Sequence, residues 1–126
     1  MQLTRLAAAA LVALAPCAAF AVTQADFAAK TTGDLANLCS ADPKEPMGDA
    51  ALNFCHGFAQ GVVTVEQERA AAEHKRLFCF PNPAPSRADT LKEFVTWARA
   101  NPGHLIEPAP NGLVGFLRAR YPCNQP

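Results

Sequence analysis

The sequence lacks an excess of charge of either sign. Its 126 residues contain 11 Lys or Arg and 11 Asp or Glu, so the formal net charge is zero when histidine is neutral. No basic run is long enough to indicate nucleic-acid binding, and no basic amphipathic stretch indicates a lipid surface. The charge pattern therefore argues against nucleic acid and membrane lipids as partners of the mature chain.

The sequence also lacks a recognisable catalytic or metal-binding pattern. Cys55 and His56 are neighbours, but adjacent helical residues point about 100° apart and do not face each other as a nucleophile and base must. A haem attachment site would need C-x-x-C-H, and zinc ligands usually occur in close pairs. No catalytic triad or phosphate-binding loop is present either. We therefore expect no catalytic residues, no metal, no cofactor and no enzymatic activity.

Long apolar runs are absent except at the N-terminus. Residues 1–21 combine a positive charge at Arg5, a short apolar core and a terminal Ala-x-Ala cleavage site. The core is shorter than the roughly 20 residues of a membrane span. We therefore predict a cleaved signal peptide at 1–21, a single mature domain at 22–126 and a periplasmic location. A lipid anchor at Cys17 is the weaker alternative, because Pro16 stands where such a site needs a small residue.

Cysteine is present in a small, even number once that segment is removed. The four remaining residues are Cys39, Cys55, Cys79 and Cys123. In a small exported chain they predict two disulfides, with three pairings open. We expect Cys39–Cys55, because the "SADPKEPMG" loop can fold back onto the early turns of the next helix. We expect Cys79–Cys123, because both lie near a proline just outside a helix, where two joints of the chain can meet.

Period-two alternation of apolar residues is absent, so no strand is predicted. Helical spacing recurs instead in four stretches separated by proline-rich segments. The fold class is therefore all-α, a small disulfide-stapled bundle of about four helices with proline-rich connecting loops. The predicted helices are one through 33–39 after a Thr31 or Thr32 cap, one from Asp49 to an end between Gln67 and Lys75, one from the Ser86 cap to the "NPG" at 101–103, and one that carries Leu113 to Tyr121 after a 104–110 connector.

Each predicted helix has one apolar face that we assign to the core. The face of the longest helix follows an i, i+3, i+7 series. Its members are Leu52, Cys55, Phe58, Val62 and Val65. The other helices contribute Leu35, Leu38 and Cys39, then Leu91, Phe94, Val95 and Ala98 with Trp97 beside them, then Leu113, Val114, Phe116, Leu117 and Tyr121.

Two glycines interrupt the longest predicted helix, Gly57 and Gly61. A helical glycine costs about 1 kcal/mol relative to alanine. We therefore expect a helix or an aromatic ring of the same chain to pack against this bare backbone. The alternative is a self-association face, which would make the protein a homodimer.

Five short segments, in this order, resemble the Rap/Tai immunity proteins of bacterial type VI secretion. They are "DLANLC" at 34–39, "FCHGFAQGV" at 54–62, "FCFP" at 78–81, "FVTWARANP" at 94–102 and "YPC" at 121–123. The resemblance covers most of the mature chain. It departs from the family pattern at Phe58, where tyrosine is expected, at His56, and in the alanine- and charge-rich stretch 66–76.

The resemblance implies an all-helical periplasmic inhibitor that binds and blocks a cognate secreted peptidoglycan amidase. The competing interpretation is a small periplasmic stress or chaperone-like helical protein. Binding commonly falls to loops that a rigid scaffold holds, so we expect contacts on 81–87 and 103–112, although both segments can equally be plain connectors. The candidate partner-binding residues are Asn82, Ser86, Arg87, His104, Glu107 and Asn111.

Overall fold

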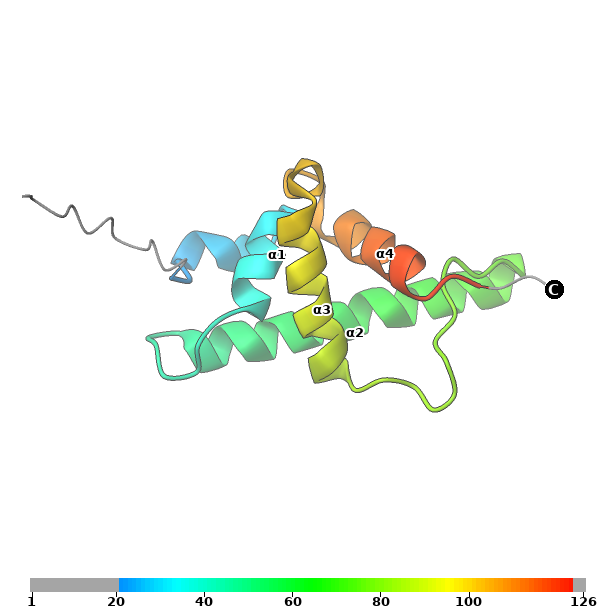
Figure 1. Cartoon of the computed structure of the whole chain (residues 1–126), viewed down its shortest axis with the longest axis horizontal. Helices are drawn as coiled ribbons and strands as arrows, with labels where there is room; N and C mark the ends of the chain where they lie inside the picture. The colour runs from blue at the N-terminus through cyan, green and yellow to red at the C-terminus, as the bar shows by residue number, and fades with distance from the viewer. Residues whose placement is uncertain (1–20, 124–126) are drawn as a thin grey trace, which may run out of the picture.

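The computed structural model describes residues 21–123, so almost all of the predicted signal peptide lies outside it. The described chain is an all-α bundle without a named strand, as predicted. Figure 1 shows the long helix α2 lying along one side of the molecule, with α1, α3 and α4 gathered against it. The elements are η1 (Gln24–Ala28), α1 (Thr32–Cys39), α2 (Gly48–Glu73), α3 (Arg87–Ala100), η2 (Pro102–His104) and α4 (Ala109–Arg120).

Helix α1 is short but central, because it contacts η1 and each of the other three α-helices. A capping box starts it: the Asp34 N–H donates to the Thr31 hydroxyl, and the Thr31 N–H donates to the Asp34 carboxylate. Its Leu35 and Leu38 are fully buried. The bounds and the inward face of this helix agree with the prediction.

Helix α2 begins one residue before the predicted start and ends inside the predicted range. A Cβ atom at Gly48 would collide with the backbone of Asp42, so only glycine fits where the loop turns into the helix. The helix ends at Glu73, and His74 follows with a left-handed φ of 54°. The protein thus continues this helix through the charged stretch that the sequence left undecided.

The inward face of α2 differs from the prediction. Its buried positions beyond Gly48 are Ala51, Cys55 and Ala59. Val65 is 61% exposed, and Phe58 and Val62 are only partly buried. The prediction is therefore wrong at Val65, whereas Phe58 and Val62 pack against the core from its edge. Small side chains face inward because the Cys39–Cys55 disulfide draws α1 and α2 together, with their Cα atoms 5.2 Å apart at that point.

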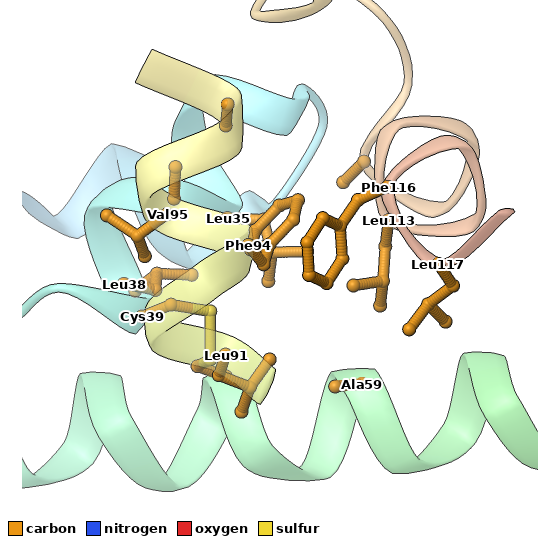
Figure 2. Packing of buried hydrophobic residues seen from close by; sticks show 14 of the residues in the cluster. Leu35, Leu38, Cys39, Ala59, Leu91, Phe94, Val95, Leu113, Phe116 and Leu117 are labelled. Atoms are coloured by element: carbon orange, nitrogen blue, oxygen red, sulfur yellow. A yellow bond between two sulfur atoms is a disulfide. The ribbon is translucent and has the colours of Figure 1, made fainter. Parts of the chain in front are cut away.

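Helices α3 and α4 complete the core in the predicted way. Figure 2 shows Phe94 of α3 and Phe116 of α4 beside Leu35 of α1, and the two rings meet edge to face at 5.7 Å. Ser86 caps α3 by accepting from the Asp89 N–H, as the sequence predicts. Helix α4 begins at Ala109, inside the predicted connector, because a proline suits the first turn of a helix.

Two disulfides close the bundle, Cys39–Cys55 and Cys79–Cys123. The predicted pairing is confirmed. The first ties the end of α1 to α2. The second ties the segment after α2 to the segment after α4, where the Cys79 N–H also donates to the Tyr121 carbonyl at 2.8 Å.

The sequence analysis missed the short helix η1. Its first turn contains a capping box between Thr23 and Asp26. The T-x-x-D spacing was the signal that identifies it. Asp26 also accepts a hydrogen bond from the Asn37 amide at 3.2 Å, which fastens η1 to α1.

Candidate partner-binding site

The six predicted partner-binding residues fall into two separate places. Asn82, Ser86 and Arg87 belong to the loop before α3 and its first turn. Asn82 is exposed, and the Asn82–Pro83 peptide bond is cis. The Ser86 hydroxyl is occupied by the α3 cap. Arg87 reaches across to α2, where its Nη2 donates to Gln60 Oε1 at 2.6 Å.

The second predicted segment is largely engaged inside the molecule. The His104 ring stacks on Trp97 with 4.7 Å between centroids, and its Nδ1 lies 3.0 Å from Glu107 Oε1. Backbone carbonyls of Leu105 and Glu107 accept from the N–H groups of Gly33 and Thr32 at the start of α1. This connector therefore positions α1.

Asn111 is exposed on α4, apart from His104 and Glu107. It lines an open groove between α2 and α4 with a volume of about 780 Å³. The second predicted segment thus borders this groove, and the loop before α3 borders a different recess.

That recess is an apolar crevice between α2, α3, α4 and the loop before α3. It has a volume of about 270 Å³. Its lining is mostly aliphatic or aromatic. The residues are Ala59, Gln60, Val63, Phe80, Ala84, Pro85, Arg87, Thr90, Leu91, Leu113 and Leu117. We call it the Arg87 crevice, after the one charged residue that lines it.

The polar groups of the Arg87 crevice have defined orientations. Gln60 Nε2 donates to Thr64 at 3.1 Å, which leaves Gln60 Oε1 to accept from Arg87. The Thr90 hydroxyl donates to the Ser86 carbonyl at 2.9 Å. The polar atoms of Gln60 and Thr90 are therefore satisfied, while Arg87 uses one donor of its guanidinium on a neutral amide.

The packing role predicted for Gly57 and Gly61 is wrong within the single chain. Both residues are exposed, and a Cβ atom on either would meet nothing within 4 Å. They lie at the floor of the α2–α4 groove beside Phe58, Val62 and Val65. The glycines face solvent because the smaller face of α2, with Ala51 and Ala59, turns inward.

An apolar strip runs along α2, exposed at its two ends, Phe54 and Val65, and half-buried between them. We define it as Phe54, Phe58, Val62 and Val65. Phe54 packs edge to face on Phe27 of η1 at 5.8 Å and stacks on Phe58 at 6.3 Å. Sequence reasoning missed the strip because it assigned three of these residues to the core. A contiguous exposed apolar surface is typical of an interaction site.

Among residues 21–123, the structure shows no free thiol, no cluster of metal ligands and no membrane-spanning helix. All four cysteines among residues 21–123 are in disulfides, so this part of the chain has no free thiol. The same residues hold no group of three His, Cys, Asp or Glu side chains that could hold a metal ion. Over the described range, each helix is too short or too polar to cross a membrane.

Comparison with known protein families identifies one to which the chain is similar. Residues 31–123 match the family model of the Rap1a immunity proteins, which is more than half of the chain. Among curated proteins and solved structures, none matches.

Proposed function

The chain belongs to the Rap1a immunity protein family, and on this premise we propose that it is a periplasmic protein that inhibits a type VI secreted peptidoglycan amidase. The family match is the observation that carries the proposal. It spans α1 to α4 and all four disulfide cysteines. Binding to a secreted effector follows from the family, while the amidase target, the secretion system and the periplasmic location extend it.

The physical form of the domain supports inhibition by binding. Two disulfides and a buried aromatic and aliphatic core hold the surface in one shape. A pre-ordered surface loses less conformational entropy on association. An immunity protein must hold its target at low concentration, so we expect a dissociation constant of nanomolar order, about −12 kcal/mol.

The proposal is tested by co-expression with an amidase encoded beside the gene, in the periplasm of a sensitive host. We expect survival of the host and a stable complex of the two purified proteins. Lysis at the rate seen without the protein, together with no detectable complex, would refute it. The catalytically inactive amidase gives the matched control for lysis.

Export is part of the same proposal. We propose that a signal peptidase removes residues 1–21. Intact-mass measurement of the periplasmic form then gives a chain that begins at Val22. A chain that retains Met1, or one that carries a lipid on Cys17, would contradict this cleavage.

One observation favours the alternative of a chaperone-like protein. The exposed strip on α2 includes Phe54, and Val65 is 61% exposed. Such a surface can hold apolar segments of unfolded proteins. Suppression of aggregation of several unrelated denatured proteins, without binding to the neighbouring amidase, would favour this second function.

A further inference from the structure

The Arg87 crevice combines an apolar lining with a cation that forms no ion pair with a carboxylate of residues 21–123. Arg87 is exposed and donates to Gln60 Oε1. Among residues 21–123, the cations in ion pairs are Arg69, Lys92, His104 and Arg120. Arg87 has no carboxylate of these residues within ion-pair distance. Arginine is well suited to bind a carboxylate through two parallel hydrogen bonds.

The interior of the crevice is built from side chains that are themselves well packed. Leu91, Leu113 and Leu117 are almost fully buried, so the apolar surface that a partner can reach belongs mainly to the other lining residues, which are Val63, Phe80, Ala84 and Pro85. Thr90 is the polar residue deepest in this wall, and its hydroxyl already donates to the Ser86 carbonyl. The interior therefore favours an apolar occupant, because it offers no unsatisfied hydrogen-bonding group.

We propose that the Arg87 crevice receives one large apolar side chain of the partner protein, and that Arg87 binds a carboxylate next to it. The inference rests on the proposed function, because it names the chemistry of the effector segment. That segment presents an aromatic or aliphatic residue beside Asp, Glu or the chain's C-terminal carboxylate.

The size of the crevice selects this occupant. Drug-sized ligands fill pockets of about 300–1,000 Å³, so a volume of about 270 Å³ suits a single large side chain. Protein interfaces concentrate their binding energy in such anchors, which fill pockets and are surrounded by a polar rim. Gln60 and Arg87 supply that rim here.

The first test uses variants of the full mature domain and the amidase encoded beside its gene. Val63→Phe fills the crevice from α2, and Ala72→Phe adds the same ring at an exposed position of α2 that does not line it. We expect Val63→Phe to weaken binding more than tenfold, because full burial of a large apolar side chain raises the affinity about 10- to 100-fold. Ala72→Phe should leave the affinity unchanged.

A second variant keeps the test decisive if Val63→Phe fails to fold. Arg87→Gln removes the charge at an exposed position, and Arg76→Gln makes the same change at an exposed arginine outside the crevice. We expect about a 3- to 10-fold loss for Arg87→Gln, in the range of one charge-assisted contact. If the amidase binds Arg87→Gln as tightly as the parent, the inference is wrong and the immunity function stands, whether or not Val63→Phe folds.

A probe peptide tests the crevice without the amidase. The probe is acetyl-Phe-Asp-amide, with acetyl-Phe-Asn-amide and acetyl-Ala-Asp-amide as controls, each titrated into the isotope-labelled domain. We expect NMR shifts at Val63, Leu113 and Leu117 that are largest for Phe-Asp. Arg87→Gln should abolish the preference for Asp over Asn but keep the preference for Phe over Ala, as a double-mutant cycle requires.

The two experiments separate the two failures. Selective binding of Phe-Asp without any amidase binding supports the crevice and refutes the amidase as its partner. Amidase binding that no crevice variant alters refutes the crevice alone. Equal shifts for all three peptides, or shifts only in the α2–α4 groove, overturn the proposed specificity. Decanoate is titrated in the same way as a fourth probe. Tight binding of decanoate but of no peptide would assign the crevice to a small amphiphile and would also overturn the proposal.

Discussion

Glycines inside the helices of this protein serve opposite purposes. A Cβ atom at Gly112 of α4 would collide with the side chain of Thr32, which is fully buried on α1. This contact lets α1 and α4 approach each other closely. Gly61 of α2 faces open space. Glycine is thus required at position 112, whereas at position 61 it only lowers the local stability of the helix.

We predict opposite stability changes for two identical substitutions. Gly61→Ala should raise the free energy of unfolding by about 0.5–1 kcal/mol, because alanine favours helix and meets no neighbour. Gly112→Ala should lower it by about 1–3 kcal/mol through overpacking against Thr32. Urea unfolding of both variants checks this. A loss of stability in Gly61→Ala would restore the packing role that the structure argues against.

Asp26 makes a pH-dependent contribution at the N-terminal end of the described chain. Burial raises the pKa of its carboxyl, but hydrogen bonds from the Thr23 N–H, the Asn37 amide and the Thr23 hydroxyl outweigh this effect. The pKa therefore lies below its ordinary value of 3.8. Because the folded state holds the proton less tightly than the unfolded state, the stabilisation is fully present above pH 3.8 and disappears as the pH falls through the folded pKa.

We predict that Asp26→Asn lowers the free energy of unfolding by about 1–3 kcal/mol at neutral pH. The difference from the parent should shrink as the pH falls through the folded pKa, because the parent then loses its charged hydrogen-bond acceptor. Urea unfolding over a pH series measures it. Asp49→Asn, at an exposed position in the first turn of α2, is the control. A difference that stays constant down to acid pH would contradict the linkage.

At the scale of the element, the apolar face of α2 is wider than the part that is buried. Its centre carries Ala51, Cys55 and Ala59 into the core. Phe58 and Val62 pack against the core at its edge and are only partly buried, and Val65 is exposed. Arg69 pairs with Glu66 and Glu73 in the last turns, which supports the helix where it carries no fully buried residue. This helix therefore serves the core along its first half and presents an accessible surface along its length.

We predict that Val65→Gln changes the free energy of unfolding by less than about 0.5 kcal/mol, because this side chain is 61% exposed. Denaturant unfolding measures it, with Leu38→Gln at a fully buried position as the strongly destabilised comparison. Sedimentation of the same variants addresses the homodimer. A dimer in the parent that Val65→Gln dissociates would assign the strip and its glycines to self-association.

At the scale of the whole molecule, the two disulfides close loops of different length. Cys39 and Cys55 are 16 residues apart, and Cys79 and Cys123 are 44 apart. The longer loop restricts the unfolded chain more strongly in the chain-entropy account. The first bridge joins two consecutive helices, and the second joins the segment after α2 to the segment after α4, so the bridges hold different parts of the bundle.

We predict that replacing both Cys39 and Cys55 with alanine lowers the free energy of unfolding by about 3 kcal/mol. The same change at Cys79 and Cys123 should lower it by about 4 kcal/mol. These losses are large against a total stability of about 5–15 kcal/mol. Urea unfolding of the two double variants and the parent gives the values. Two variants as stable as the parent would show that packing alone holds the fold.

The sequence by itself determined the features that local chemistry controls. The Thr31 and Ser86 caps, the end of α3 before Pro102 and the apolar faces of α1 and α3 follow from neighbours within a few residues. The even number of cysteines after residue 21 and the loop geometry also led to the correct disulfides. The family resemblance was likewise contained in short ordered segments, and the match over 31–123 confirms the immunity family.

Only the tertiary structure decided how much of the apolar face of α2 is buried. Periodicity places Phe58, Val62 and Val65 on the face of Cys55, but the first two are only partly buried and Val65 is exposed. The close approach of α1 at Cys55 instead selects alanine for the interior and leaves Gly57 and Gly61 in the open. The Arg87 crevice likewise exists only after folding, because its walls come from α2, α3, α4 and a loop. The spacing of residues within one segment does not predict which distant segments will form a common surface.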